Sequence, residues 1–101
     1  MRNNLFEIEN LPPLDSEIFI TLLEQKNIKI KKIISNTIKT PQTFIQKEDE
    51  FVVLLKGCAK IEINGEIKKL KAGDYLFIPA NTPHTLLKTK KTAIWLAIHI
   101  Y

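Results

Sequence analysis

Few side chains in this sequence could bind a metal ion or transfer a proton near neutral pH. The chain carries two histidines, His84 and His99, and a single cysteine, Cys58. An imidazole titrates close to neutral pH and is the most frequent protein ligand of metals, and a carboxylate such as that of Glu50 can act as a ligand or a general base. Each also has a structural alternative, because a histidine is often hydrogen-bonded inside a core and a glutamate at the start of a strand is often solvated.

His99 and Cys58 are the weaker candidates. Toward the C-terminus the apolar side chains of Leu96, Ile98 and Ile100 occupy every second position. We expect this face to enter the core, so that His99 lies on the opposite face and away from any site. Cys58 has no histidine or arginine near it in the sequence that would activate its thiol. It is therefore expected to be a small buried apolar side chain rather than a nucleophile.

The rest of the chain must supply the elements that position these residues, and most of it has the pattern of short strands. Apolar side chains alternate with polar ones or form short continuous runs, which is typical of half-buried and central strands. Asn64-Gly65 predicts a hairpin turn, with a three-residue loop that sets Ile63 opposite Ile67. About seven or eight strands are expected, at the spacing of an antiparallel sandwich or barrel. The segments include residues 28–38, 51–55, 59–63, 75–78, 85–87 and 92–100.

The first part of the chain, residues 1–27, is expected to differ from this strand-rich body. Asp15 or Ser16 could cap a short helix that runs from about Ser16 to Gln25. Apolar side chains recur at helical spacing within it and would form one stripe. Because such a stripe must be covered, we predict that this helix packs on the outside of the strand layer.

Two stretches of the chain resemble the motifs of the cupin family. Glu50 to Gly57 matches a glutamate and a glycine separated by six residues. Gly73 to His84 matches the order Gly, five residues, Pro, one residue, Gly, two residues, His, with Asn81 in place of the second glycine. Asparagine tolerates the positive φ that a turn at this point would require. With the strands around them, these motifs make the chain similar to small single-domain cupins of the conserved-barrel type.

The resemblance implies an all-β fold, a cupin-type antiparallel jelly-roll β-barrel. Combined with the pattern of the first residues, it predicts a short N-terminal helix before the barrel. Residues 1–101 would then form a single cupin domain, in which residues 1–27 are an N-terminal strap and residues 28–101 are the barrel.

For cupins that hold a metal, the resemblance implies a His-x-His pair and a glutamate from the first motif and a histidine from the second. The positions of the His-x-His pair fall here on Phe44 and Gln46, or one residue earlier, and contain no histidine. Only Glu50 and His84 remain as metal ligands, so the implied site is degenerate. Gln46 and Glu48 could add weak oxygen donors. We expect no tightly held cofactor, and at most a weakly bound divalent Zn, Ni, Fe or Mn ion.

Two functions from different classes follow from this resemblance. The first is a binding protein that holds a small polar ligand in the mouth of the barrel. The second is a metal-dependent small-molecule enzyme of the oxygenase, isomerase or decarboxylase type. The missing histidines favour the binding protein, and a closed barrel with a purely structural role is a third alternative. The expected ligand-binding residues are Gln46, Glu50, Tyr75, Phe77 and His84.

Composition and charge limit the partners. A chain of 101 residues provides one domain, and its apolar runs are far shorter than the ~20 residues of a membrane helix. The net charge is +4, but 14 of the 15 basic residues are lysines without interleaved arginine or aromatic residues, so neither nucleic-acid nor membrane binding is expected.

A single cysteine and no signal-peptide pattern predict a cytoplasmic protein. Apolar segments in excess of what a small monomer exposes predict a homodimer.

Overall fold

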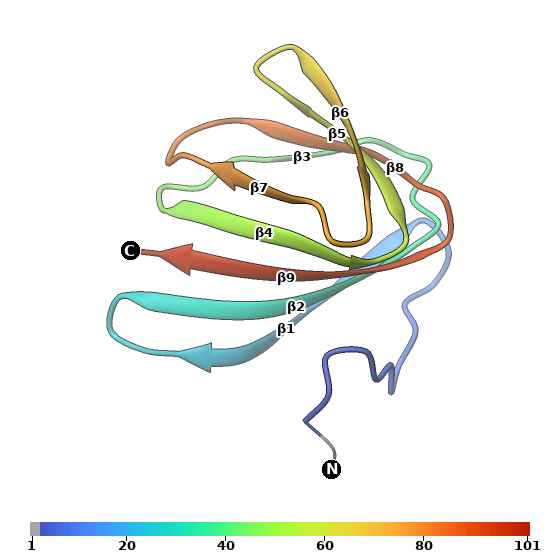
Figure 1. Ribbon diagram of the computed structural model, residues 1–101, viewed down its shortest axis with the longest axis horizontal. Coiled ribbons are helices and arrows are strands. Elements are labelled where there is room, and N and C mark those ends of the chain that lie inside the picture. Colours follow the sequence, from blue (N-terminus) through green and yellow to red (C-terminus); the bar gives the residue numbers. More distant parts are fainter. Residues whose placement is uncertain (1–2) are drawn as a thin grey trace.

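The computed structural model describes residues 3–101, which form two antiparallel β-sheets around a common interior (Figure 1). The first sheet has the strand order β1-β2-β9-β4-β7, and the second has the order β3-β8-β5-β6. No helix occurs in this part of the chain, so the expected all-β architecture is confirmed. The strands are β1 (Ser16–Glu24), β2 (Ile28–Asn36), β3 (Gln42–Phe44), β4 (Asp49–Lys56), β5 (Cys58–Ile63), β6 (Glu66–Lys71), β7 (Tyr75–Ile78), β8 (His84–Thr89) and β9 (Thr92–Ile100).

The predicted N-terminal helix is wrong, because the residues from Ser16 to Glu24 form strand β1. This strand pairs antiparallel with β2, from Ser16 opposite Asn36 to Glu24 opposite Lys29. Its run of β-branched and aromatic residues suits a pleated strand better than a helix. The neighbouring strand β2 supplies the hydrogen-bond partners that the backbone of a strand requires. Asp15 does not cap a helix; its φ of 62° lets the chain turn into β1.

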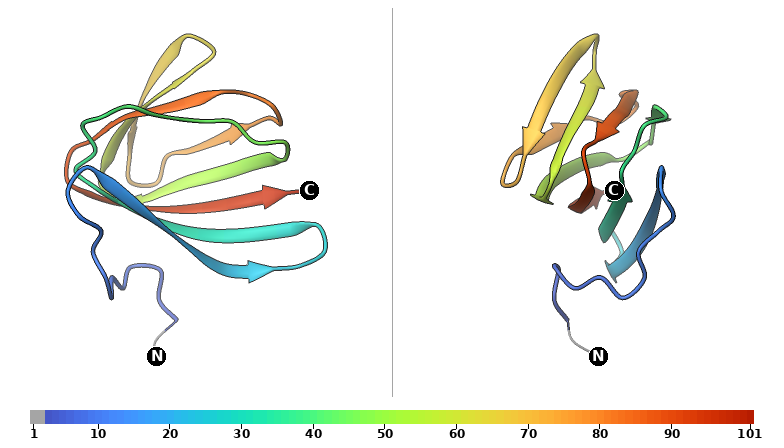
Figure 2. Two further views of the ribbon diagram at one scale, coloured as in Figure 1. Left: turned by 180° about the vertical axis from the view of Figure 1, so that it is seen from behind. Right: turned by 90° about the vertical axis from the view of Figure 1, so that its right-hand side faces the viewer.

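The hairpin between β5 and β6 has a two-residue loop, and the predicted three-residue loop is wrong. Asn64 and Gly65 have φ values of 53° and 76°, which is the backbone of a tight hairpin turn of the mirror-image type. Ile63 therefore lies opposite Glu66. In both views of Figure 2 this hairpin and the N-terminal segment lie at opposite ends of the molecule.

The buried face of β9 is the opposite of the one expected from the sequence. Trp95 and Ala97 are 4% and 0% exposed, whereas Ile100 is 45% exposed and Leu96 and Ile98 are only partly buried. The alanines on the inner face are small, so they leave room for the large indole of Trp95 to fill the interior. Bulkier side chains in their place would not leave that room. Because side chains alternate along a strand, this inversion also turns His99 toward the interior.

Two contacts hold the ends of β4 and β8 against the rest of the fold. Gly57 follows β4 with a φ of +93°, and a Cβ at this position would lie 2.8 Å from the carbonyl oxygen of Thr92. Only glycine fits there without displacing the backbone. At the end of β8, the hydroxyl of the buried Thr89 accepts a hydrogen bond from the backbone N–H of Ile38 at 2.8 Å.

Over residues 3–101, no helix has the length and hydropathy needed to cross a membrane.

Candidate ligand site between the sheets

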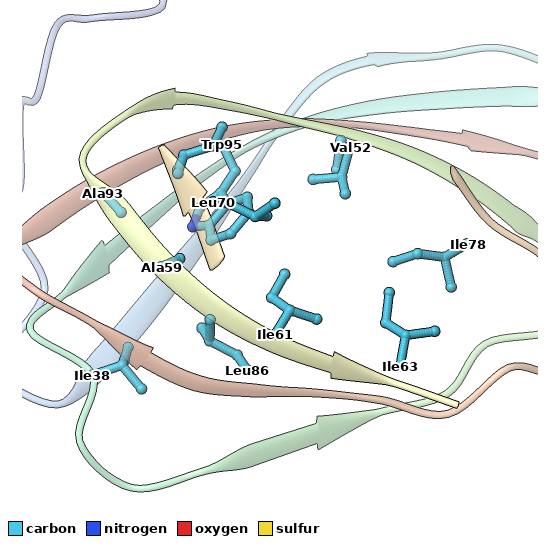
Figure 3. Close-up of a cluster of buried hydrophobic side chains, with 12 residues drawn as sticks. Ile38, Val52, Ala59, Ile61, Ile63, Leu70, Ile78, Leu86, Ala93 and Trp95 are labelled. Carbon is cyan, nitrogen blue, oxygen red and sulfur yellow. The ribbon is translucent and has the colours of Figure 1, made fainter. Parts of the chain in front are cut away.

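A cavity of about 300 Å³ lies between the two sheets. Most of its wall is apolar, and five of the side chains that form it belong to the core drawn in Figure 3, namely Val52, Ile61, Ile78, Leu86 and Trp95. Glu17 and Lys31 line part of this wall, and the other polar side chains form one group, which we call the polar cluster: Gln46, Glu48, Glu50, His84 and His99. A largely apolar cavity with a few converging polar groups is the usual form of a small-molecule site.

Glu50 lies close to three other members of the polar cluster. The amide Nε2 of Gln46 donates a hydrogen bond to Glu50 Oε1 at 2.7 Å. His84 Nε2 lies 3.8 Å from the same oxygen, and His99 Nε2 lies 3.9 Å from Oε2. The Glu50 and the two histidine side chains are each about nine-tenths buried. A carboxylate thus stands between two imidazoles, with neither imidazole in direct hydrogen bond to it.

The loop before β8 explains why His84 comes so close to Glu50. Asn81, with a φ of 61° as expected for the replacement of a glycine, donates its backbone N–H to the carbonyl oxygen of Gln46 at 2.7 Å. The backbone N–H of Ala80 donates to Asp49 Oδ1 at 2.8 Å. These two bonds attach the loop to the segment that enters β4. His84, the first residue of β8, therefore begins its strand beside the start of β4.

The second ring nitrogen of each histidine fixes where its proton lies. His84 Nδ1 is 3.1 Å from the backbone carbonyl oxygen of Thr82, and His99 Nδ1 is 2.9 Å from Glu48 Oε2. A carbonyl oxygen and an ionised carboxylate can only accept, so in both rings Nδ1 carries the proton and donates it. In the neutral rings each Nε2 is therefore an acceptor. With Glu50 Oε2, three hydrogen-bond acceptors converge without a donor between them.

These three acceptors face the cavity. None of them has a hydrogen-bond partner within residues 3–101. In the same residues, Glu17 Oε1 is the only side-chain polar atom that lacks a partner and is also fully enclosed. The two Nε2 atoms and Glu50 Oε2 therefore keep accessible surface, and the residues that carry them line the cavity. Because these acceptors remain accessible, a ligand with suitable donors could form hydrogen bonds with them.

A second chain of polar groups reaches the cavity from β1 and β2. Trp95 Nε1 donates to Ser35 Oγ at 3.0 Å, and Ser35 Oγ in turn donates to Glu17 Oε2. Glu17 lines the cavity. Burial raises the pKa of the Glu17 carboxyl, and the hydrogen bond from Ser35 offsets this only in part. No feature of the sequence singled out Glu17, because the position was assigned to a helix.

The structure brings together three of the five residues predicted to bind a ligand. The expected proximity of Gln46, Glu50 and His84 is confirmed by their distances. Their role in binding stays a prediction. His99 was expected elsewhere, and this is wrong, because the choice of the buried face of β9 was inverted. The signal that could have found it was the pair of alanines on the same face as His99, since small residues mark a face that packs closely.

Three other predicted placements are wrong. Tyr75 and Phe77 of β7 were expected in the barrel mouth, but they are 65% and 56% exposed and lie outside the cavity lining. They alternate with the buried Ile78, which takes the inner face of this short strand. Cys58 was expected to be buried, but it is exposed at the start of β5. It precedes Ala59, whose side chain takes the inner face instead.

The polar cluster does not form a ready-made metal site. Among residues 3–101, no group of three or more His, Cys, Asp or Glu side chains is arranged to hold a metal ion. Glu48 Oε2 is engaged with His99 Nδ1, and Glu50 Oε1 is engaged with Gln46 Nε2. The family's His-x-His positions, Phe44 and Gln46, offer no imidazole. The residues present therefore do not fit the metal that the resemblance implies, and no chemical step is assigned to one.

Comparison with known proteins agrees with this geometry. A family model described as a cupin domain matches residues 37–99. An uncharacterized protein of Aquifex aeolicus is 35% identical over 79 residues, and the match spans 78% of this chain and 64% of that protein. The chain thus corresponds to less than two thirds of that relative's length.

Solved structures give the same result. A suspected mannose-6-phosphate isomerase from Ralstonia eutropha JMP134 is 34% identical, with a TM-score of 0.85 over 99% of this chain and 97% of its own. An RmlC-like cupin from Shewanella frigidimarina is 20% identical, with a TM-score of 0.75 over 93% and 82% of the two chains, and shows the shared fold. On the family model and on these likenesses, this chain belongs to the cupin domain family.

Proposed function

We propose that this protein binds a small molecule in the cavity between its sheets, by a head group that donates hydrogen bonds. The observation that carries the proposal is the set of three unpaired acceptors, Glu50 Oε2, His84 Nε2 and His99 Nε2, on residues that line a largely apolar cavity. The apolar wall would hold the body of the ligand, and the acceptors would hold its head. Glu50, His84 and Gln46 thus keep the ligand-binding role expected of them, and His99 joins them.

The chemistry of the three acceptors favours a primary ammonium group as the head. An ammonium presents three donors and one positive charge. The Glu50 carboxylate supplies a negative charge that is largely shielded from water, where charge-assisted hydrogen bonds are strongest. At the polar cluster a carboxylate or phosphate head would meet acceptors and the like charge of Glu50, whereas Lys31, which also lines the cavity, lies outside this cluster. A hydroxyl head could use one acceptor but would leave the others unpaired.

The single tryptophan of the chain provides the assay. Trp95 is 4% exposed and lines the cavity, so its fluorescence should respond to occupation of the site. We would titrate the protein with benzylamine, benzyl alcohol and phenylacetate, which share one aromatic body and differ in the head. Benzylamine should bind most tightly. Glu50→Gln should weaken it by about tenfold or more, since a charge-assisted hydrogen bond becomes a neutral one.

The control is Glu62→Gln, which removes the same charge from the half-buried outer side of β5, outside the cavity lining. This variant should bind benzylamine as the wild type does. Equal affinity for phenylacetate and benzylamine would refute the ammonium head. Equal loss in the two glutamine variants would refute the assignment to Glu50.

The alternative function expected from the sequence, a metal-dependent enzyme, would require the two imidazoles and the Glu50 carboxylate to rearrange around an ion. We expect no stoichiometric metal after chelation and dialysis, because the cluster is not arranged around an ion. Elemental analysis is the measurement. About one metal per chain that survives this treatment, and that is lost in both Glu50→Ala and His84→Ala, would contradict the prediction and favour the enzyme.

We also propose that two copies of the chain associate through β1. Within residues 3–101 this strand pairs only with β2, so its other edge carries free backbone donors and acceptors. Several of its large apolar side chains are exposed, among them Phe19 at 51% and Leu22 at 46%. An exposed apolar edge strand is stabilised when a second copy covers it.

A further inference from the structure

The outer face of the second sheet carries a compact group of lysines that the cavity does not explain. We call it the lysine face, and it consists of Lys60, Lys69, Lys71, Lys88 and Lys90. All five are exposed, and they line a hollow of about 520 Å³ that is separate from the cavity between the sheets. They come from β5, from β6 and from the end of β8.

The strand register places these lysines in two adjacent rows. Lys60 on β5 lies directly opposite Lys69 on β6 and directly opposite Lys88 on β8. The three therefore form one row across three strands, with neighbours about 5 Å apart. In the next row, Lys71 lies opposite Cys58. On the other side of Cys58, Lys90 donates its backbone N–H to the Cys58 carbonyl oxygen.

This arrangement is unfavourable for the isolated fold. Like charges directly opposite each other on neighbouring strands repel, and none of the five lysines forms an ion pair within residues 3–101. Asp74 is the one carboxylate that lines the hollow with the five lysines, and it accepts the backbone N–H of Lys71 at 2.9 Å; Glu62 lies one row farther along β5. A concentrated charge without a partner is a feature that a bound counter-charge would stabilise.

We propose that the lysine face binds a compact polyanion with two or more linked phosphate groups. Lysine binds phosphate as a point charge, and a row of lysines on neighbouring strands, with Cβ atoms about 5 Å apart, suits a ligand whose charges are closely linked. The face contains no arginine and no aromatic side chain, so it lacks the groups that read or stack nucleic-acid bases. A small ligand that fills the hollow therefore suits the face better than an extended nucleic acid.

The test is calorimetric titration with inorganic tripolyphosphate at low and physiological salt. The double variant Lys60→Gln/Lys69→Gln removes two of the three lysines of the row that crosses β6, β5 and β8. The double variant Lys26→Gln/Lys47→Gln removes the same charge from exposed positions outside the face and serves as the control. We expect at least a tenfold loss of affinity in the first variant and less than twofold in the second. The first variant should melt no lower than the wild type, because it relieves like-charge pairs.

The single cysteine gives an independent readout of occupancy. Cys58 is exposed within the lysine face, so tripolyphosphate should slow its alkylation by neutral iodoacetamide. This protection should be absent in the Lys60→Gln/Lys69→Gln variant. Equal loss of affinity in both double variants would overturn the proposal in favour of diffuse attraction to a basic protein. Tighter binding of a single-stranded oligonucleotide than of tripolyphosphate would overturn it in favour of a nucleic-acid surface.

Discussion

Replacing Thr89 by valine should destabilise the fold by removing one acceptor while keeping the shape of the side chain. Thr89 is 1% exposed, and its hydroxyl accepts the backbone N–H of Ile38, which is itself fully buried. In Thr89→Val that N–H would have no acceptor, at a cost of about 1–3 kcal/mol. The carbonyl oxygen of Lys91, to which the hydroxyl donates at 3.2 Å, would still accept the N–H of Thr37.

Chemical denaturation measures this cost, and a domain of this size loses about 4–8 °C in melting temperature per kcal/mol. The control is Thr89→Ser, which keeps the hydroxyl and loses one buried methyl group worth about 1 kcal/mol. Hydrogen exchange separates the two variants, because the amide of Ile38 should lose protection in the valine variant and keep it in the serine variant. A valine variant as stable as the wild type, with the Ile38 amide still protected, would refute the reasoning.

Three further predictions concern pH and assembly. Burial raises the pKa of Glu17, so the ionised carboxyl opposes folding, and the stability that the protonated form contributes is lost as pH rises. The Glu17→Gln variant should therefore unfold at a higher urea concentration than the wild type at pH 8. At pH 4 it should lose this advantage. Hydrogen bonds from the side chain and backbone of Thr40 hold the pKa of Asp15 at about 2, below its ordinary 3.8. This stabilisation is present above about pH 4 and is lost as pH falls toward 2, so urea titrations of Asp15→Asn over this range should show a smaller acid dependence than those of the wild type. Light scattering should give twice the chain mass of 11.6 kDa at micromolar concentration and a monomer for Leu22→Lys; a wild-type monomer would contradict pairing through β1.

Much of the strand layout could be predicted from the sequence because alternation and hairpin signals are local. The segments 59–63, 75–78 and 92–100 form strands as expected. The helix prediction failed at β1 because apolar residues at positions 18, 19, 22 and 23 satisfy a helical stripe as well as a strand. The neighbouring strand β2 decides between the two, and pairing with it is a tertiary contact that no local pattern contains.

The site was predictable as far as the motifs reach. Glu50 and His84 lie in the two motifs, so their convergence followed from the resemblance. His99 lies outside both motifs, and its position depends on which face of β9 is buried. Apolar side chains on alternate positions favoured one face, but β9 carries apolar side chains on both faces, and Leu96 and Ile98 on the outer face are partly buried as well. Hydrophobicity alone cannot choose the inner face of such a strand.

The position of β9 also has a consequence for how this chain folds. β9 follows every other strand in the sequence, yet it separates β2 from β4 and forms hydrogen bonds with both. During synthesis on the ribosome, β1 and β2 can form a hairpin early, but the middle of the first sheet stays open until β9 has emerged. Such non-local pairing slows folding. The open edges of β2 and β4 are exposed to intermolecular pairing in that interval, so nascent chains shortened before β9 should aggregate rather than fold.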